Sequence, residues 1–515
     1  MSYRRQRIRD PLHGLIEFRA EHFEHVLWQA IQTRPFQRLR RVKQLGFSEF
    51  VYPGATHTRF AHSLGTFHVA RQLMEIIKRH KFTGIDEPKI QQVLAATLLH
   101  DLGHGPFSHA FEDVGKRLKL KSVDHEKWTE RLIRETEIAE ALKAMGSGFA
   151  NDVADIFKRG HPESMYEAAV SSQFDADRLD YMQRDRLMTG TNHGAIDFAW
   201  LLANIEIGEV PHGVDDDPYG GSLETFVLGA KAVSAAETYV LGLLQLYQTV
   251  YFHKATRGIE KLFTELLVRV FESIRDNRVC QTGLPESHPL VKFALAPENL
   301  DVYLSLDDAV VWGAIPMLAE AKDTVIAELA GRLRDRKLYK CLDVWQLTAQ
   351  LVADTDRVRR CCPEILERLK TRVIPGLAES HHLLLDQAAR APYKRFDESK
   401  GPLNQIRIRT ADGGNLVDIN SRSAIVPAIP SVELWRVYLP ADQHDLRKRV
   451  QDTVREVVNE NRNYSQRRHA ESSRNYRGGW WQIGRAYAFA EAWLPTGTRW
   501  FGRWVRVQLP TLWPV

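Results

Sequence analysis

The sequence predicts a mainly α-helical protein with a small α+β lobe near its C-terminal end. An apolar run over residues 93–99 is helix-like, and segments rich in Ala and Leu extend with helical character over residues 225–274. Residues 285–380 also have helical character. The pattern then changes to the alternation typical of strands, as in Glu433–Leu439, and a helix is expected over about 444–459.

The chain has 515 residues, which is longer than one typical domain, so two or three modules are expected. The net charge of +5 and the pI near 8.8 permit an anionic substrate without requiring nucleic acid. The four cysteines show no CxxC spacing, which favours a reduced setting. The basic N-terminus has no apolar segment behind it, and no run approaches the ~18 apolar residues of a membrane span. We therefore expect a cytoplasmic protein with no signal peptide and no membrane insertion.

The remaining elements follow from turn and helix signals along the chain. Residues 1–20 predict a turn followed by a short strand, and residues 21–50 have helical character. A turn at 52–57 precedes a helix that is expected to end near Lys81. Residues 208–222 are rich in Gly and Asp and are expected to form a polar loop.

The most informative stretch is Leu98–His109, where a helix-like run brings His100 and Asp101 side by side at its end. Two glycines and a proline break the helix, and two more histidines, His104 and His109, accompany the break. Histidine and carboxylate ligands suit Fe, Mn, Zn or Mg better than copper. Because adjacent helix residues point about 100° apart, both can reach one ion only where the helix ends. The alternative interpretation is a helix C-terminus with solvated histidines.

Upstream, Arg59 and His62 are three residues apart, so they share one face of the predicted helix. That face can present a metal ligand together with a cation for phosphate, and the planar guanidinium pairs phosphate oxygens bidentately. His57 and His68 are metal ligands by residue type. We leave them out of the predicted site because single histidines more often pack or face solvent.

Downstream, the segment Phe174–Asp185 places unlike polar groups on one helix face. On a helical wheel these residues are Asp177 at 0°, Tyr181 at about 40°, Asp185 at about 80° and Arg178 at about 100°. Carboxylates, a guanidinium and a phenol are unsuited to a buried core face. A solvated face can hold the charged groups, but the tyrosine fits that alternative poorly.

A histidine, a His-Asp pair and a later aspartate, in this order, resemble the HD-domain phosphohydrolase superfamily. The closest resemblance is to the branch of sterile-alpha-motif/HD-domain dNTP triphosphohydrolases and their bacterial relatives. It extends over roughly residues 5–275 and more loosely to 460. It implies an HD-domain helical core with a small α+β C-terminal lobe, without the sterile-alpha-motif module. The expected domains are 1–280 (HD phosphohydrolase), 281–395 (helical extension), 396–460 (α+β lobe) and 461–515 (a tail rich in Trp and Arg).

The resemblance also implies a divalent metal, of which Fe, Mn, Zn and Mg remain open. Its expected ligands are His62, His100, Asp101 and Asp177. Near-neutral imidazoles are natural proton donors. We expect His109 to protonate the leaving sugar oxygen, His104 to bond the phosphate and His125 to support them, although a structural role for His125 stays open. The expected substrate contacts are Gln44, Leu45, Arg59, Arg178, Tyr181, Asp185, Tyr251 and Lys254.

Other matches concern regulation. Gln37 and Arg40 stand where family members bind an activating nucleotide between subunits, whereas Gln32 and Arg9 depart from the residues of a GTP-type site. Leu243 stands near a position where the animal enzyme has an arginine for the triphosphate. A solvated Arg-rich helix is the alternative interpretation of residues 36–46.

The implied function is hydrolysis of a deoxynucleoside triphosphate by water attack at the α-phosphorus, in a homo-oligomer that is a dimer or a tetramer. The alternatives are an HD-type phosphohydrolase or nuclease on other nucleotides or single-stranded nucleic acid, and a non-catalytic nucleotide-binding sensor. The tail interleaves Trp with Arg, a composition that suits single-stranded nucleic acid. Docking of the tail on the protein itself or on a sister subunit is the preferred interpretation.

Overall fold

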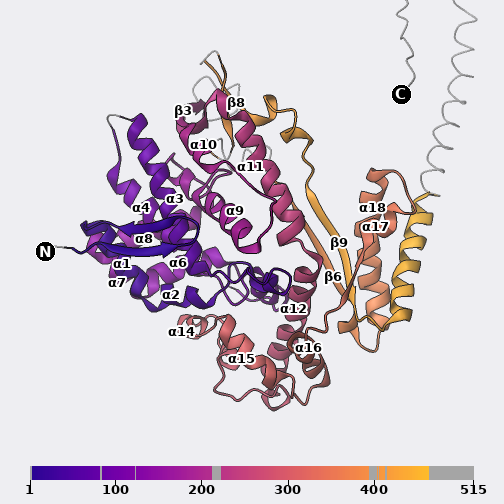
Figure 1. Cartoon of the computed structure of the whole chain (residues 1–515). Helices are drawn as coiled ribbons and strands as arrows, with labels where there is room; N and C mark the ends of the chain where they lie inside the picture. The colour runs from indigo at the N-terminus through magenta and orange to yellow at the C-terminus, as the bar shows by residue number, and fades with distance from the viewer. Residues whose placement is uncertain are drawn as a thin grey trace, which may run out of the picture. The chain divides into compact units, whose positions relative to one another are not determined.

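The computed structural model describes residues 3–462, apart from 82–83, 122, 212–221, 394–402, 404 and 412–413 (Figure 1). The predictions for the tail fall on residues 463–515 and lie outside the described residues. The observed architecture is mainly helical with small sheets, as the sequence predicts.

The first part of the chain is a helical bundle around one apolar core. Its helices are α1 (His22–Gln32), α2 (Arg34–Arg38), α3 (Arg59–His80), α4 (Glu87–Leu99), α6 (His125–Glu135), α7 (Glu137–Leu142), α8 (Phe149–Arg159), α9 (Ala176–Thr189), α10 (Phe198–Ala203) and α11 (Val233–Leu246). Helix α5 (His109–Arg117) follows α4 in the chain but buries Phe111 in a second core. Helix α3 lies against α4 on one side and α9 on the other. The bundle therefore brings together the three segments that the sequence singles out.

Local capping fixes where the site-bearing helices begin and end. The Asp86 carboxylate accepts a hydrogen bond from the Lys89 backbone N–H at the start of α4. The Asp175 carboxylate does the same for Arg178 at the start of α9, and Gly190 ends α9 with a φ of +69°. These caps place His100 just beyond α4 and Asp177 in the first turn of α9.

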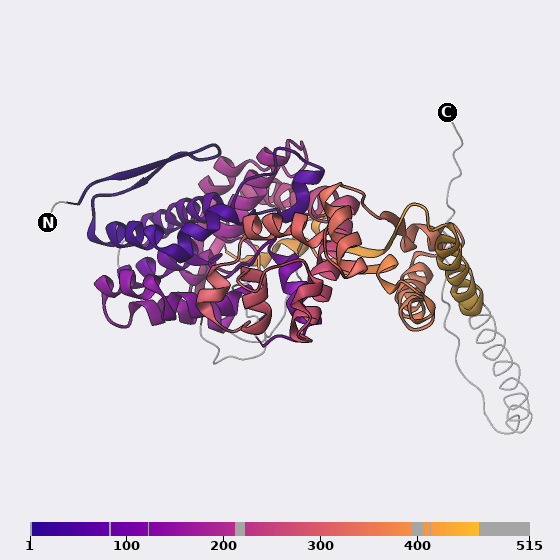
Figure 2. The same ribbon diagram turned by 90° about the horizontal axis from the view of Figure 1, so that it is seen from below.

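An antiparallel hairpin of β1 (Gln6–Asp10) and β2 (Gly14–Phe18) precedes the bundle. Figure 2 shows it in indigo along one side of the helices. The hairpin turns where the sequence predicts, and the Asp10 carboxylate accepts hydrogen bonds from the backbone N–H groups of Leu12 and His13.

A second apolar core gathers around a long helix, α12. The helices of this part are α12 (Lys254–Arg275), α13 (Pro289–Leu295), α14 (Leu300–Leu304), α15 (Asp308–Leu318) and α16 (Thr324–Arg334). The loop after the His-Asp pair enters this core, because the Phe107 ring stacks on Phe47 with centroids 4.1 Å apart. The same loop thus carries candidate site residues and, through Phe107, is held in the second core.

The last part contains two small sheets and further helices. The four-stranded sheet has the order β3-β4-β7-β8, and the three-stranded sheet has the order β5-β9-β6. Their elements are β3 (Ile205–Pro211), β4 (Ser222–Leu228), β5 (Lys340–Asp343), β6 (Leu384–Arg390), β7 (Arg407–Arg409), β8 (Leu416–Asp418), β9 (Val432–Leu439), α17 (Val344–Ala349) and α18 (Thr355–Arg368). In Figure 1 the long strands β6 and β9 run beside α12, with α17 and α18 on their other side.

The strand at 433–439 and the helix near 444 are confirmed by β9 and by a helix over residues 444–462. The expected loop at 208–222 is partly wrong, because β3 extends to Pro211. The helix expected from residue 225 begins only at Val233, after strand β4. Strands β3 and β4 pair with each other over their full length. Such pairing decides the conformation of segments whose local pattern is ambiguous.

All four cysteines are free thiols. Among the described residues, no helix combines the length and apolar character that a membrane crossing requires.

Candidate functional site

Four predicted metal ligands converge from three helices. Helix α3 supplies His62, the end of α4 supplies His100 and Asp101, and α9 supplies Asp177. The Nε2 atoms of His62 and His100 are 3.2 Å apart. Asp177 Oδ1 lies 2.9 Å from His62 Nε2 and 3.7 Å from His100 Nε2. Asp101 Oδ1 lies 3.4 Å from His100 Nε2. The convergence expected from the sequence is therefore present in the geometry.

The ring nitrogens show that this donor set fits a divalent cation. His62 Nδ1 contacts Asp180 Oδ2 at 2.8 Å, and His100 Nδ1 contacts the Thr97 carbonyl oxygen at 2.9 Å. These acceptors place the protons on Nδ1, so both Nε2 atoms present lone pairs to the same point. Two lone pairs 3.2 Å apart beside two carboxylates repel unless a cation lies among them.

Without a metal, a proton on His62 relieves the repulsion between these donor atoms. Burial opposes the charged imidazole, but hydrogen bonds to Asp177 and Asp180 raise the pKa of His62 to about 10. Burial likewise opposes ionisation of Asp101, and the Arg59 guanidinium holds the pKa of this carboxyl well below its usual range. The carboxylates are thus ionised and ready to accept a cation.

A layer of buried charges supports His62 from behind. Asp180, which accepts from His62, also lies 2.6 Å from His13 Nε2 and accepts from Arg184 Nε at 2.7 Å. The Arg184 Nη1 atom in turn donates to Asp10 at 2.8 Å, which ties the hairpin turn to the site. Helices α3 and α9 approach closely here, since a Cβ added at Gly65 would lie 1.9 Å from Asp180 Oδ1. This layer fixes the orientation of the His62 ring.

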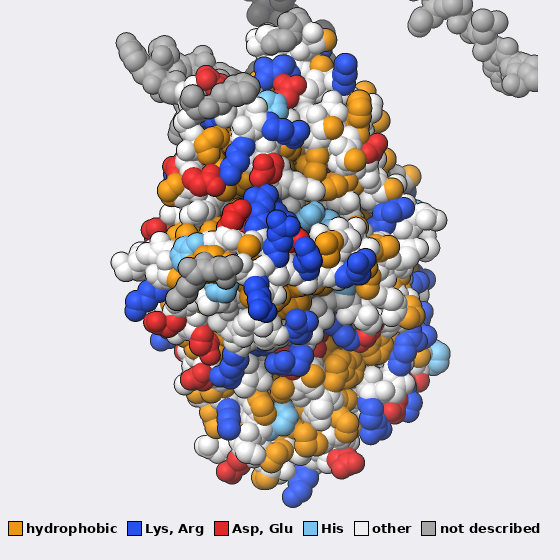
Figure 3. Space-filling view, turned by 60° about the vertical axis from the view of Figure 1, so that its left-hand side comes forward, with side chains coloured by type: hydrophobic (Ala, Val, Ile, Leu, Met, Phe, Trp, Pro, Cys, Tyr) orange, Lys and Arg blue, Asp and Glu red, His pale blue; other side chains and the backbone are white. Residues whose placement is uncertain are grey.

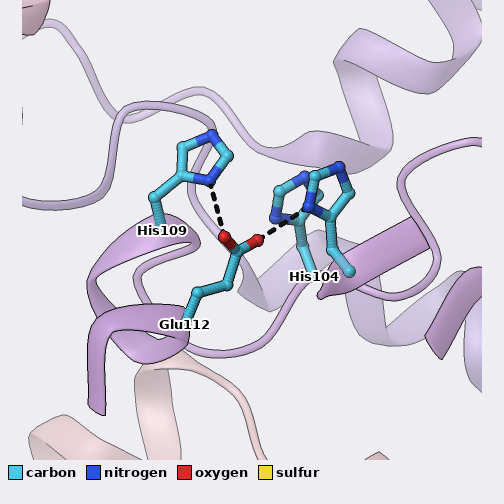
Figure 4. Close-up of side chains that lie close together, drawn as sticks. His104, His109 and Glu112 are labelled. Atoms are coloured by element: carbon cyan, nitrogen blue, oxygen red, sulfur yellow. Dashed lines mark hydrogen bonds and ion pairs between the residues drawn. The ribbon is translucent and has the colours of Figure 1, made fainter. Parts of the chain in front are cut away.

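The second part of the site is a cluster of three imidazoles around one carboxylate. Glu112 lies between His109 and a stacked pair of imidazoles, as Figure 4 shows. His125 Nδ1 contacts Glu112 Oε1 at 2.7 Å, and His109 Nδ1 lies 3.3 Å from Glu112 Oε2. The rings of His104 and His125 stack with centroids 3.9 Å apart. His104 Nε2 also lies 3.3 Å from Asp101 Oδ1, so the cluster adjoins the metal donors.

The environments of these imidazoles differ. Burial lowers the pKa of His104 well below its usual value, so this ring is neutral. Burial also opposes the charge on His125, but its bond to Glu112 outweighs this and raises the pKa of His125. The His109 side chain is 70% exposed, unlike that of His104 at 3%. His109 is therefore the imidazole that an incoming ligand reaches most easily.

The loop that carries His104 and His109 is strained and held from both sides. Phe107 and Ser108 have φ values of +54° and +56°, which L-residues rarely adopt. The Asp308 carboxylate holds this conformation by accepting a hydrogen bond from the Phe107 N–H at 2.8 Å. The buried Arg38 donates to the His104 carbonyl oxygen at 2.7 Å. Asp308 and Arg38 come from distant segments of the chain, and together they hold the loop in its strained conformation.

The polar residues expected on one face of α9 lie in two different environments. Asp185 is buried, and its carboxylate receives the Tyr251 hydroxyl at 2.8 Å and contacts His57 Nε2 at 2.7 Å. The Tyr181 ring lies edge-on to that of Tyr251, with centroids 6.1 Å apart. The Arg178 guanidinium bonds the Asp175 carboxylate. The structure thus joins Tyr181, Asp185 and Tyr251 in one group.

The other predicted substrate contacts lie in different surroundings. Arg59 lies at the centre, donating to Asp101 Oδ2 at 2.7 Å and to Ser108 Oγ at 2.9 Å. The Gln44 side-chain oxygen is buried and has no hydrogen-bond partner among the described residues. Leu45 packs against the first core, and Lys254 has an exposed side chain at the first residue of α12.

The two residues predicted to bind an activating nucleotide lie together. Arg40 Nε donates to Gln37 Oε1 at 2.8 Å, and the Arg40 guanidinium lies 3.6 Å from the centre of the Phe60 ring. Phe60 precedes His62 by two residues on α3. Arg40 therefore contacts the helix that carries His62.

Comparisons with known proteins agree with this geometry. Residues 59–186 match the family model described as HD domain. The chain is 29% identical to the uncharacterized protein YwfO of Bacillus subtilis, over 84% of this chain and 92% of that one. It is 26% identical to the mouse deoxynucleoside triphosphate triphosphohydrolase SAMHD1, over 83% of this chain and 68% of that one. A solved phosphohydrolase from Bacteroides thetaiotaomicron has a TM-score of 0.63 and 26% identity, and the similarity covers 85% of this chain and 99% of that one.

Residues 59–186 are thus recognised as an HD domain, and the similar proteins support the HD-domain phosphohydrolase superfamily for this chain. This similarity supports a hydrolase, and HD domains bind divalent metals. The matched residues 59–186 contain His62, His100, Asp101 and Asp177 and the whole imidazole cluster. The HD domain thus accounts for the centre of the site, whereas Tyr251 comes from outside it.

Sequence reasoning missed three residues that shape the HD site. Glu112 follows His109 by three residues, and Asp180 follows Asp177 by three residues. Helical spacing alone, applied outward from each predicted residue, would have found both. His57 was set aside as a lone histidine, yet it contacts Asp185. No local signal identifies that contact, since its partners are far apart in the chain.

The surface charge also suits an anionic ligand. On the face that Figure 3 shows, Lys and Arg side chains gather across the middle of the molecule, with few carboxylates among them. Such a surface attracts phosphorylated compounds over several ångströms.

Proposed function

We propose that this protein hydrolyses deoxynucleoside triphosphates to deoxynucleoside and inorganic triphosphate. The observation that carries the proposal is the contact between two functional groups in one HD site. Asp101 lies among the metal donors, and its Oδ1 is 3.3 Å from Nε2 of His104 in the imidazole cluster. Cation binding and proton transfer can therefore act on the same phosphate. The similarity to a protein named as a deoxynucleoside triphosphate triphosphohydrolase supports this choice of substrate.

In this mechanism, water attacks the α-phosphorus and the bond to the 5′ oxygen of the sugar breaks. His62, His100, Asp101 and Asp177 would hold a divalent cation, which would supply activation of water and neutralisation of phosphoryl charge. Arg59 supplies a fixed positive charge beside these donors and pairs a phosphate oxygen. His104 Nε2 lies 3.3 Å from Asp101 Oδ1, and as a neutral imidazole His104 adds no charge beside the phosphate.

The leaving sugar alkoxide needs a proton, and His109 is placed to give it. The Nδ1 of His109 faces the Glu112 carboxylate, so the imidazolium form of His109 has its Nε2–H left for the leaving oxygen. The Glu112 carboxylate orients the His109 ring and stabilises its positive charge, as the aspartate of a catalytic triad does for its histidine. His125 holds Glu112 from the other side.

The sugar is recognised by the group formed by Tyr181, Asp185 and Tyr251. The hydrogen-bonded Tyr251 and Asp185 fix an acceptor for the 3′ hydroxyl. Leu45 provides an apolar wall, against which an extra 2′ hydroxyl would lose its hydrogen bonds to water. Preference for deoxynucleotides follows from this wall.

The test is an assay of the full chain loaded with Mn²⁺, Fe²⁺, Zn²⁺ or Mg²⁺ against each dNTP and NTP, with products resolved by ion-pair chromatography. We expect deoxynucleoside and triphosphate in equal amounts. A His62→Ala/Asp101→Ala variant is the matched control, which removes two donors and should abolish release. Release of monophosphate and pyrophosphate, or equal turnover of ribonucleotides, would refute the proposal.

One observation favours a second candidate, an HD-type phosphohydrolase acting on other nucleotides or on single-stranded nucleic acid. Leu243 is 3% exposed within the first core, so it offers no cation to a triphosphate. The same assay with an end-labelled oligonucleotide distinguishes this candidate by shortening of the strand. A non-catalytic sensor is disfavoured, because His62, His100 and Asp101 lie close enough together to hold an ion and the imidazole cluster adjoins them.

A further inference from the structure

A second group of metal-type ligands lies outside the HD domain, where helix α16 meets the segment before strand β6. Glu328 comes from α16, and His381 and His382 are consecutive residues of the short 3-10 turn Ser380–His382. The Glu328 carboxylate contacts the Nε2 atoms of both histidines at 3.0 Å. Figure 1 shows α16 beside the lower end of β6.

The ligand atoms have the spacing of a small coordination polyhedron. Glu328 Oε2 lies 3.0 Å from His381 Nε2 and 3.2 Å from His382 Nε2. In a tetrahedral zinc site with bonds of about 2.0–2.1 Å, neighbouring ligand atoms are about 3.3 Å apart. A small outward movement of the three atoms therefore makes room for an ion at their centre.

The second ring nitrogen of His382 indicates that a cation belongs there. His382 Nδ1 lies 2.8 Å from the Glu379 carboxylate, so this nitrogen carries a proton and donates it. The opposite nitrogen, Nε2, faces the Glu328 carboxylate. A neutral ring would then direct a lone pair at a negative oxygen. Either a second proton or a metal ion must compensate this repulsion.

The surroundings favour the metal ion. The pair formed by Glu379 and His382 is the carboxylate–histidine arrangement that orients zinc ligands. The other Glu328 oxygen is held by Arg332 Nε at 2.7 Å, which leaves Oε2 for the ion. The His381 and His382 side chains are 6% and 10% exposed, against 28% for Glu328. Two sheltered imidazoles and one carboxylate reachable from water leave a fourth position for a water molecule.

We propose that Glu328, His381 and His382 bind a divalent transition-metal ion of the zinc class. The ion joins α16 to the segment that leads into strand β6, and so connects the second helical core to the three-stranded sheet. It is separate from the ion of the HD domain, and its role is structural. The proposal does not depend on the proposed hydrolase activity.

The test measures metal content and affinity in the full chain, stripped with chelator and titrated with Zn²⁺ alone. A His381→Ala/His382→Ala variant should bind one equivalent fewer than the unaltered protein. A Glu328→Gln variant, which keeps the shape of the side chain, should bind that equivalent about tenfold or more weakly. A His161→Ala variant is the matched control, because His161 is exposed and far from these ligands in the chain, and it should bind normally.

Two further measurements complete the test. The His62→Ala/Asp101→Ala variant should retain one equivalent and, with Co²⁺, give the intense visible absorption of four-coordinate cobalt. Zn²⁺ should raise the melting temperature of that variant but not that of the same variant carrying His381→Ala/His382→Ala. If the double-histidine variant loses its circular dichroism, Glu328→Gln supplies the decisive comparison. Equal zinc binding by the unaltered protein and by Glu328→Gln would overturn the proposal and assign the cluster to a bound proton.

Discussion

At the scale of single residues, the HD site depends on side chains that lie behind the metal donors and do not face the point where the four donors converge. Asp180 is fully buried and bonds His62, His13 and Arg184 at once. Its charge fixes the proton of His62 on Nδ1, which leaves Nε2 available. Asp180 therefore affects metal binding by fixing the orientation of the His62 ring.

Replacement of Asp180 by asparagine should therefore weaken metal binding. The Asp180→Asn side chain keeps the size but loses the charge that orients His62, and we expect affinity to fall about 10–100-fold. Competition with a fluorescent chelator measures this change. Asp152→Asn, at an exposed position of α8, is the matched control and should bind normally. Unchanged affinity in a folded Asp180→Asn protein would contradict the orienting role.

A second prediction concerns the proton donor. Removal of a general acid typically costs about 10²–10⁴-fold in rate, and we expect this loss in kcat for His109→Ala. Glu112→Gln should show a smaller loss, because the imidazole remains. A nucleotide ester with an acidic leaving group needs no proton, so His109→Ala should hydrolyse it almost normally. Undiminished turnover of dNTPs by His109→Ala would rule out this assignment.

The sequence reveals residues of this site to different degrees. His62, His100, Asp101 and Asp177 could be predicted because their order along the chain is specific to the superfamily. Glu112 has no such family signal, and only its helical spacing of three residues from His109 indicates it. Its contact with His125 depends on the packing of α5 against the start of α6, which no local pattern encodes.

At the scale of elements, the close approach of α3 and α9 determines the site. A methyl group at Gly65 would lie 1.9 Å from Asp180 Oδ1 and 2.3 Å from Arg184 Nη2. We expect Gly65→Ala to lower the free energy of unfolding by about 1–3 kcal/mol and to weaken metal binding together with it. Urea unfolding and chelator competition measure the two effects.

Gly331 in α16 provides the control for this prediction. A Cβ at Gly331 meets no atom within 4 Å. Gly331→Ala should therefore raise the free energy of unfolding by roughly 0.5–1 kcal/mol, as expected for alanine in a helix interior. A Gly65→Ala protein as stable as the unaltered chain would show that α3 and α9 can separate without cost.

The link between α5 and α6 should give a pH-dependent stability. The pKa of His125 is raised above its ordinary value of 6.5 in the folded state. Its stabilising effect is therefore fully present below that value and is lost as the pH rises through the folded pKa. His125→Gln should cost roughly 1.5–3 kcal/mol at about pH 6 and progressively less as the pH rises. Urea unfolding over a pH series measures this, and a cost that does not fall with rising pH would contradict it.

Elements differ in how far the sequence predicts them. Helices α3 and α9 could be predicted because the turn before α3, the Asp175 cap of α9 and the residue spacing within each helix are local signals. Strands β5 and β6 could not, since both pair with β9, which lies about 100 and 50 residues further along the chain. Strand β9 was recognised from its own alternation, but its partners lack so clear a pattern.

At the scale of the whole molecule, the loop with the HD histidines lies between two apolar cores. The first core holds α3, α4 and α9, while Phe107 and Phe111 belong to the second core around α12. The metal donors and the imidazole cluster are thus fixed from different cores.

Nucleotide-dependent assembly would act at this scale. The pair formed by Arg40 and Gln37 is predicted to bind an activating nucleotide between subunits, and Arg40 lies over Phe60, two residues before His62. A phosphate that attracts Arg40 away from Phe60 would change the contacts of α3 at its first turn. Assembly and activity should then respond to the same ligand.

We therefore expect each dNTP that activates the enzyme to increase its mass in light scattering, from a smaller form to a dimer or tetramer. Arg40→Glu reverses the charge that meets the phosphate, so it should abolish both the mass increase and the activation. Its affinity for Mn²⁺ should stay unchanged, because Arg40 contacts none of the metal donors. Arg79→Glu, at an exposed position in the last turn of α3, should behave like the unaltered protein. Activation without any change in mass would separate the two effects and place the activating nucleotide within one subunit.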